Sequence, residues 1–270
     1  MVRVEMLAVG KELLIGRTLN SNALWIGRRL ARMGSMIKEI TTVDDDLDEI
    51  GAAVLAIVRR SPDFLVVVGG LGPTPDDMTL KGIAGALGLK LARDGEALRL
   101  IRGHYRDRGM EGVALTPPRM KMATIPAGST PLPNDAGTAP GVRLVAGRTV
   151  VFCLPGVPVE MRGIFRRSVE PEIRAKVGKI FRRSLTMRLE GVPESALAPY
   201  LAEEMKRHPG AYIKSHPRGT REGVSRIMLD IVVAGPDRGR ADAEGEAILS
   251  EMKKAVAAIG GTVGAARSSA

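Results

Sequence analysis

The chain has 270 residues, of which 44% are hydrophobic and 26% charged, with one cysteine and a net charge of +10. This length allows one large domain with a full core and a smaller second domain. No apolar run approaches the roughly 18 residues that a membrane span needs, and the N-terminus lacks the apolar core and cleavage site of a signal peptide. We therefore expect a cytoplasmic protein, and the single thiol, Cys153, is expected to be a buried core residue that forms no internal disulfide.

The excess of positive charge is not concentrated in one patch. Only 3% of the residues are aromatic, so the composition gives little support to a nucleic-acid partner. The densest basic segment, from Arg162 to Arg183, is interpreted mainly as a solvated helical face. The chain also contains no glutamine and three asparagines, a depletion of heat-labile amides that suits a thermophilic source.

In chain order, three predicted strands alternate with helices. The strands are residues 2–10, 36–43 and 64–68, and the helices cover about residues 22–34 and 48–60. An apolar stripe of Leu24, Ile26, Leu30 and Met33 marks the first helix, and Ser21 or Asn22 is expected to cap it. This alternation predicts right-handed βαβ units and a mainly parallel sheet. Because ligands of such sheets lie at the carboxyl ends of the strands, we expect residues 10–12, 44–46 and 69–77 along one rim.

The third strand ends at a glycine loop, which begins GGLGPTPDD at Gly69. Glycines let backbone amides approach a ligand closely, so this loop is typical of a phosphate site. Asp76 and Asp77 would repel a phosphate unless a cation lies between them, which indicates a divalent metal. The alternative is an ordinary turn in which Asp77 caps a helix that starts near Met78.

The remaining pattern predicts helices at 80–87 and 96–108 and a mostly irregular, functional loop over 116–141. Strands at 142–145 and 148–154 form a hairpin around Gly147, and Pro158 starts the next helix. From Phe181 onward a βαββα order predicts a small two-layer sandwich with its helices on one face of an antiparallel sheet. Residues 265–270 are expected to be a frayed tail.

Four blocks together resemble the N-terminal domain of the CinA-type competence/damage-inducible proteins, which is similar to the MoaB/Mog molybdopterin-binding fold. The blocks are KELLIGRTLNSN from Lys11, GGLGPTPDDMT from Gly69, NDAGTAPG from Asn134 and LPGVPVEM from Leu154. The resemblance covers about residues 1–175. It implies a three-layer α/β domain with a mainly parallel sheet over 1–175, followed by a small α+β two-layer domain over 181–264 and the tail. Many relatives carry a further amidase domain, for which there is no room after Ala270, so deamidation is not expected.

The resemblance implies a small-molecule ligand that carries phosphate, either a nucleotide or a phosphorylated pterin. Some CinA-type domains are described as metal-dependent pyrophosphatases that split ADP-ribose into AMP and ribose 5-phosphate, and we take this as the leading hypothesis. Relatives of the Mog type instead join AMP to molybdopterin, which is the first alternative. The second alternative is a non-catalytic module that binds nucleic acid or protein through the basic segment and the small domain. The expected cofactor is a divalent metal ion of unknown identity, and a homo-oligomer is expected because oligomers are common for this kind of fold.

The resemblance also implies site residues. Asp45 and Asp77 are the expected catalytic carboxylates. Asp45, Asp76 and Asp77 are the expected metal ligands. Because Asp44 and Asp46 flank Asp45, which of Asp44, Asp45 and Asp46 acts stays open. The expected phosphate ligands are Gly69, Gly70, Gly72 and Thr74. Further ligand contacts are expected from Glu12, Asn22, Asn134, Gly137, Thr138, Gly141, Pro155, Gly156, Pro158 and Glu160. The alternative for the glycines and prolines of the last group is that they only shape turns.

Overall fold

A computed structural model describes residues 2–110, 112, 114–221, 223–264 and 267–269. It divides into two compact units, Met1–Gly178 and Lys179–Ala270, so the division falls between the two predicted domains. Helices long and apolar enough to cross a membrane are absent from the described residues.

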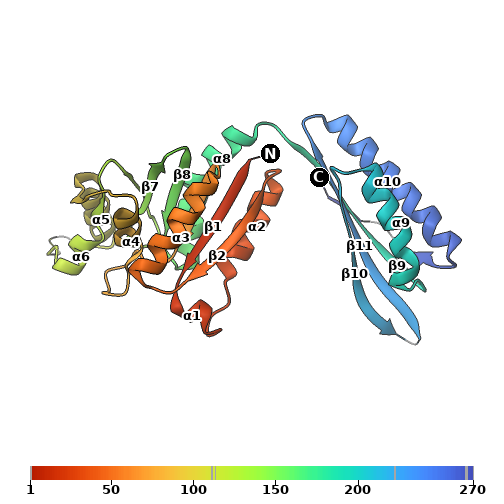
Figure 1. Cartoon of the computed structure of the whole chain (residues 1–270), viewed down its shortest axis with the longest axis horizontal. Helices are drawn as coiled ribbons and strands as arrows, with labels where there is room; N and C mark the ends of the chain where they lie inside the picture. The colour runs from red at the N-terminus through yellow and green to blue at the C-terminus, as the bar shows by residue number, and fades with distance from the viewer. Residues whose placement is uncertain (1, 111, 113, 222, 265–266, 270) are drawn as a thin grey trace. The chain divides into compact units, whose positions relative to one another are not determined.

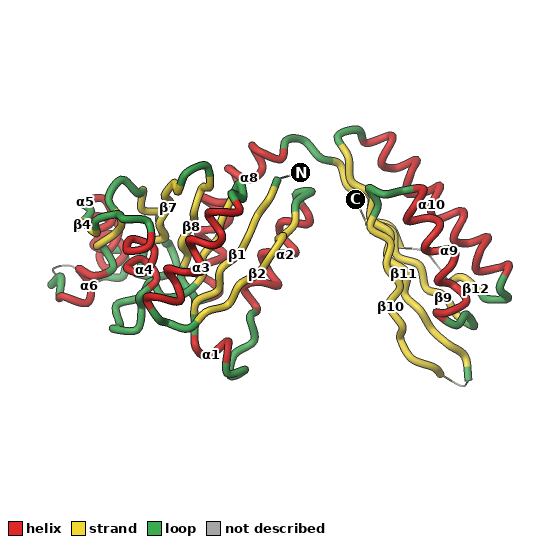
Figure 2. The backbone as a smooth tube through the Cα atoms, viewed as in Figure 1, coloured by secondary structure: helices red, strands yellow, loops and turns green. Residues whose placement is uncertain are grey.

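The first unit is built on a six-stranded sheet, which is mainly parallel, as predicted. Figures 1 and 2 show this sheet with helices on its faces. Its strands lie in the order β2-β1-β3-β8-β7-β6, and the first four of these are parallel. The hairpin strand β7 and the short edge strand β6 run antiparallel to their neighbours. The strands are β1 Arg3–Val9, β2 Met36–Val43, β3 Phe64–Val68, β6 Thr130–Leu132, β7 Gly141–Ala146 and β8 Thr149–Leu154.

Helices cover both faces of this sheet, which confirms the three-layer prediction. Side chains of β1 alternate between two cores: Leu7 and Val9 face one side, and Met6 and Ala8 face the other. The first core includes helices α3 Leu47–Arg60, α4 Thr79–Ala86 and α5 Gly95–Arg106. The second includes α2 Ser21–Arg32, α7 Pro158–Ile164, the π-helix η1 Phe165–Val169 and α8 Glu170–Val177. The single thiol, Cys153, is buried, and burial raises its pKa to about 12.

Three details of this unit differ from the predictions. Helix α2 is capped by Asn20, whose side chain accepts a hydrogen bond from Ala23 N, and Leu24 is 51% exposed instead of joining the core. The segment predicted as a mostly irregular loop contains the helix α6 Pro117–Lys121 and two short strands. Strand β5 Thr124–Pro126 pairs with β4 Leu91–Arg93, and β6 extends the main sheet. These elements were missed because three-residue strands and a one-turn helix give no periodic pattern.

The second unit has the predicted βαββα order. It consists of β9 Phe181–Glu190, α9 Glu194–Arg207, β10 Tyr212–Arg221, β11 Val224–Gly235 and α10 Arg238–Ala258, followed by β12 Thr262–Val263 and β13 Arg267–Ser269. Strands β10, β11, β9 and β12 form an antiparallel sheet whose apolar face packs against both helices. Strand β13 pairs with β9, so residues 267–269 are not a frayed end, whereas residues 265, 266 and 270 of the predicted tail lie outside the described residues.

The basic segment is not one solvated helical face. Helix α8 ends at Val177, and Arg182 and Arg183 belong to β9. Within the first unit many of its cations have partners: Arg167 Nη1 lies 2.9 Å from Asp135 Oδ1, and Lys176 Nζ lies 3.1 Å from Asp63 Oδ1. Two further guanidinium groups, of Arg162 and Arg166, lie over the ring of Trp25. These contacts tie the segment to its own domain.

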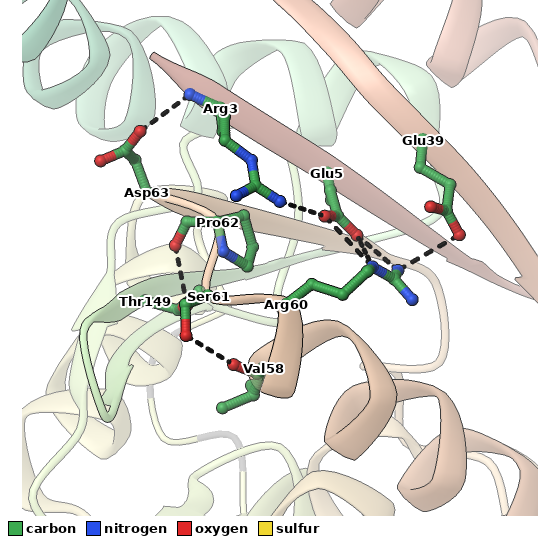
Figure 3. Close-up of polar contacts among 9 residues, drawn as sticks. All are labelled: Arg3, Glu5, Glu39, Val58, Arg60, Ser61, Pro62, Asp63 and Thr149. Atoms are coloured by element: carbon green, nitrogen blue, oxygen red, sulfur yellow. Dashed lines mark hydrogen bonds and ion pairs between the residues drawn. The ribbon is translucent and has the colours of Figure 1, made fainter. Parts of the chain in front are cut away.

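An ion-pair network around the buried Glu5 lies toward the amino ends of β1 and β3 (Figure 3). Glu5 is 1% exposed, and both its oxygens accept hydrogen bonds from Arg60 at the end of α3. Arg3 Nη2 lies 3.8 Å from Glu5 Oε1, and Arg60 also pairs with Glu39 on β2. Asp63, just before β3, accepts a hydrogen bond of 2.8 Å from Arg3 N. Glu5 and Asp63 each have a charged or amide partner. The carboxylates at the amino ends of these strands are therefore neutralised within the protein and need no bound cation.

Candidate functional site

The carboxyl ends of the four parallel strands border a cavity of about 830 Å³. Its wall is formed by the segments that follow β1, β3 and β8, together with Asp45 after β2 and residues of α5 and α6. Asp45 and Asp77 both line this cavity, as do the three glycines of the loop after β3. The rim that the strand order predicts is therefore present, and its parts converge on one space.

The glycine loop requires glycine at its first two positions. Gly69 has φ of 114°, and a Cβ there would lie 2.1 Å from Val9 O on the neighbouring strand. Gly70 has φ of 63°, and its Cβ would lie 2.3 Å from Thr79 Oγ1. The Thr79 hydroxyl is buried and donates a hydrogen bond of 2.8 Å to Gly69 O. These contacts fix the loop between β1 and the start of α4, so other residues would distort it.

The same loop leaves consecutive backbone amides available to a ligand. The Gly69 N–H donates to Leu154 O, whereas the N–H groups of Gly70, Leu71 and Gly72 have no acceptor among the residues that the structure describes. Successive unpaired N–H groups in a turn form a concave anion-binding site. We call residues 69–72 the cradle, because their free N–H groups would allow an anion to bind there.

Asp77 closes the turn that follows the cradle. Its Oδ2 accepts hydrogen bonds from Thr74 N at 2.9 Å and from Thr74 Oγ1 at 2.5 Å. Helix α4 begins after Met78 without a side-chain cap, so the interpretation of Asp77 as a helix cap is wrong. The Thr74 hydroxyl also interacts with the neighbouring Asp76, and this hydrogen bond lowers the pKa of Asp76. Thr74 therefore positions both aspartates from behind the cavity wall.

The structure separates the three aspartates after β2. Asp46 caps α3 by accepting from the N–H groups of Asp48 and Glu49. Asp44 pairs with Lys11 at 3.1 Å, and that hydrogen bond lowers its pKa. Asp45 alone of the three lines the cavity, with its Oδ2 accepting from Lys11 N at 2.9 Å. Burial raises the pKa of Asp45, and the charges of Glu12, Asp44 and Asp76 add to this effect.

The charged groups that line the cavity are strongly unbalanced. Its described lining contains the five carboxylates Glu12, Asp45, Asp76, Asp77 and Glu160, and one cation, Arg119. Within the described part of the chain, no group of three or more His, Cys, Asp or Glu side chains is arranged to hold a metal ion by itself. Asp45 and Asp76 do lie close enough for the charge of one to raise the pKa of the other. Since Mg²⁺ is usually bound through one or two carboxylates plus phosphate oxygens and water, these residues fit a hard cation that binds jointly with a phosphate.

The other predicted residues form two groups: some line the cavity, and the rest support the residues that line it. Asn22, Thr138, Pro155, Gly156 and Pro158 line the cavity. Asn22 Nδ2 donates to Gly156 O at 2.7 Å, which ties the segment after β1 to the turn after β8. The supporting residues are Asn134, Gly137 and Gly141, which lie behind the lining.

Asn134 organises that support around a carboxylate of the wall. Its Nδ2 donates to Glu160 Oε2 at 2.6 Å and to Ala139 O at 2.7 Å. Its Oδ1 accepts from Gly137 N at 3.0 Å, and Gly141 starts β7 beneath this turn. Asn134 thus orients Glu160 toward the cavity without lining it.

Three residues of the site were missed by the sequence analysis. Tyr105 and Arg119 line the cavity, with the guanidinium carbon 4.7 Å from the centre of the tyrosine ring and Arg119 Nε 3.1 Å from the hydroxyl. Lys121, the last residue of α6, donates through Nζ to the carbonyl oxygens of Gly72 and Thr74. Burial lowers the pKa of Lys121, against the opposing charges of Asp77 and Asp76. These residues were missed because α6 itself was not predicted, and nothing in the sequence pattern linked its segment to the glycine loop.

Residues 5–175 match the family model described as a probable molybdopterin binding domain. The chain belongs to this family. It is 40% identical over 237 residues to a protein of Pyrobaculum aerophilum, with 88% of each chain covered, and 38% identical over 263 residues to a protein of Aeropyrum pernix, with 97% of this chain and 96% of the other covered.

Two further relatives connect the chain to CinA-like members of the family. A CinA-like protein of Frankia casuarinae is 44% identical over 211 residues, which are 76% of this chain and 48% of that protein, so the match spans about half of the relative. A crystal structure of CinA from Thermoplasma acidophilum, described as of unknown function, is 41% identical with a TM-score of 0.57 and covers 63% of this chain and 98% of that chain. The resemblance drawn from the four sequence blocks is therefore confirmed, as is the fold that it implies.

Proposed function

We propose that this protein hydrolyses a nucleotide diphosphate ester such as ADP-ribose with the help of a divalent metal ion. The observation that carries the proposal is the cavity itself, in which an anion cradle faces five carboxylates and one arginine. A diphosphate placed there is repelled by the carboxylates unless a cation lies between them. Membership of a family described as molybdopterin-binding supports a small-molecule ligand in this cavity.

Asp45 and Asp76 are the residues that would hold the metal together with the ligand, and Asp77 keeps the adjacent turn closed. When bound, a divalent metal supplies charge neutralisation at phosphate oxygens and activation of water. The raised pKa of Asp45 reflects a carboxylate whose charge is poorly stabilised by the protein alone. A nearby cation therefore interacts more favourably with Asp45 than with a carboxylate that is already paired.

The remaining groups bind and orient the ligand. The unpaired N–H groups of Gly70, Leu71 and Gly72 would donate hydrogen bonds to phosphate oxygens, and Lys121 supports the loop by donating to the carbonyl oxygens of Gly72 and Thr74. Such preorganised dipoles stabilise charge that develops during phosphoryl transfer without having to reorient. In the overall reaction water adds to one phosphorus atom and the bridging bond breaks, which gives AMP and ribose 5-phosphate from ADP-ribose.

The test is incubation of the pure protein with ADP-ribose and Mg²⁺, Mn²⁺, Co²⁺ or Zn²⁺, followed by chromatographic measurement of AMP. We expect AMP and ribose 5-phosphate in equal amounts, loss of both with a chelator, and recovery when the metal is restored. A parallel sample of Asp45→Asn shows whether any product comes from this site and not from a contaminant. If no metal supports cleavage while ADP-ribose still binds, the hydrolytic function is wrong.

A second candidate is binding of a phosphorylated pterin or transfer of AMP to it. The description of the matching family as molybdopterin-binding favours it. Under this function the protein retains molybdopterin through gel filtration and, with ATP and metal, releases pyrophosphate only when the pterin is present. Cleavage of ADP-ribose without any pterin requirement would favour the first function.

A further inference from the structure

A second cavity, of about 1030 Å³, adjoins the first. It is lined by α5, by residues that follow this helix and by the segment 133–140. Tyr105 and Thr138 line both cavities, so the two spaces share a wall. The shared wall is not part of the sheet, because Tyr105 lies on α5 and Thr138 lies in the turn before β7. The two cavities therefore lie next to each other, on either side of Tyr105 and Thr138.

The two cavities carry opposite charge. The described lining of the second contains four arginines, Arg99, Arg102, Arg106 and Arg108, against Asp107 and Asp135. Among the described residues, the lining of the first has five carboxylates and one cation, Arg119, which lies against the shared Tyr105. One end of a ligand that spans both would need a metal ion, and the other end would meet arginine directly.

Two of these arginines are available to an anion. Arg99 pairs with Glu96, and Arg106 Nε lies 3.8 Å from Asp107 Oδ1, so their charges are partly compensated. Arg102 has no charged or hydrogen-bonding partner among the residues described.

The other available group is Arg108. Its Nη1 lies 2.8 Å from His104 Nδ1, and its Nη2 donates to Ala136 O at 3.5 Å. Burial lowers the pKa of His104, and the charge of Arg108 lowers it further. The imidazole therefore holds the guanidinium in place without adding a negative charge beside it.

We propose that this second cavity is a subsite for a phosphate monoester group on the same ligand, bound by Arg102 and Arg108 without metal. Arginine suits this role because its planar N–H groups match phosphate oxygens in pairs. The substrate class is then a nucleotide diphosphate ester that carries an additional terminal phosphate, and plain ADP-ribose is an incomplete version of it. This inference rests on the proposed function for the position of the diphosphate.

The experiment compares ADP-ribose with two derivatives that carry one more phosphate, at the adenosine 2′ position or at the 1″ position of the distal ribose. Binding is measured by titration calorimetry with the full chain and a fixed Mg²⁺ concentration. We expect one derivative to bind about ten-fold more tightly than ADP-ribose, as charge-assisted hydrogen bonds to a phosphate allow. The double variant Arg102→Met, Arg108→Met is expected to remove this preference and to leave binding of ADP-ribose within about two-fold. Arg59→Met, an exposed arginine at the end of α3, is the matched control and keeps the preference.

Equal binding of all three ligands by the unmodified protein overturns the subsite, and so does a preference that survives in the double variant. Thermal unfolding of each variant shows whether a lost preference reflects lost folding. The readout is independent of catalysis. An arginine-dependent preference without any cleavage supports the subsite while refuting the hydrolase, and cleavage without the preference does the reverse.

Discussion

The two ends of the strands in the first unit differ in how their carboxylates are neutralised. Toward the amino ends of the strands, Glu5 is buried against Arg60 and Arg3, and Asp63 accepts from Arg3 N (Figure 3). Asp63 also pairs with Lys176. At the carboxyl ends, five carboxylates share a cavity with one arginine among the residues that the structure describes. The first arrangement is complete within the protein and stabilises the fold. The second leaves repulsion that a bound cation and ligand would relieve, which is why we assign function to this end.

The largest expected effect at the amino end comes from Arg60→Met. It leaves Glu5, only 1% exposed, without its nearest cation, and breaking a buried pair in this way costs several kcal/mol. Because Arg3 remains 3.8 Å away, we expect a loss of about 3 kcal/mol in the free energy of unfolding, measured by urea denaturation. Arg59→Met, next to it but without an ion-pair partner among the described residues, should stay within about 0.5 kcal/mol. Ligand binding by Arg60→Met at a temperature where it is folded should be unchanged, and a loss there would break the comparison.

At the carboxyl end, Asp45→Asn should act on activity and not on folding. Removal of the charge at the metal and phosphate site is expected to lower turnover of ADP-ribose by about 100-fold or more, a typical cost for one electrostatic group. The free energy of unfolding should stay the same or rise, because the pKa of Asp45 is raised by burial and by neighbouring carboxylates. Asp46→Asn is the matched control, since asparagine caps a helix as well as aspartate does. Equal losses of turnover in the two variants would refute the assignment of Asp45.

Lys121→Met tests whether the cradle depends on its outer clamp. Without the ammonium group the carbonyls of Gly72 and Thr74 lose a donor, and Asp76 and Asp77 lose a nearby positive charge. We expect about ten-fold weaker binding of ADP-ribose in the presence of metal, which is roughly the value of one hydrogen bond to a charged group. Lys81→Met on the exposed side of α4 is the control. Unchanged affinity in Lys121→Met would mean that the contacts of Thr79 and Asp77 are enough to hold the loop in shape.

The strands and loops that form this site could be predicted from the sequence, but not every side chain that faces the cavity. The buried strands could be predicted because Phe64–Val68 is apolar throughout and the following glycines stop it abruptly. Parallel strand order then sufficed to bring Asp45 and Asp77 to one rim. Which aspartate of three faces the cavity depends on how the chain turns into α3, and composition does not encode that turn.

The contacts around α6 were beyond prediction for another reason. Lys121 bonds to Thr74 across a sequence separation of 47 residues, and Arg119 reaches Tyr105 on a different helix. Such pairs depend on tertiary packing, and α6 itself is too short to show a helical period. The sign of the charge in each cavity could likewise be read only after the walls were known.

The smallest expected effect is in the pH dependence of stability, where the two ends should differ in sign. Burial raises the pKa of Asp45, whereas the hydrogen bond from Arg3 N lowers that of Asp63, each relative to the ordinary value of 3.8. The unfolded chain ionises both near 3.8, so the native state with Asp45 loses stability as the pH rises from there through the raised pKa. The contribution of Asp63 is present above 3.8 and is lost as the pH falls through its lowered pKa. Urea unfolding with a chelator from about pH 3 to about pH 7 should therefore show Asp45→Asn gaining on the unmodified protein as the pH rises, while Asp63→Asn falls behind it. If both variants changed in the same direction, the carboxylates at the two ends would be equally satisfied, and the electrostatic argument for a cation at the cavity would lose its basis.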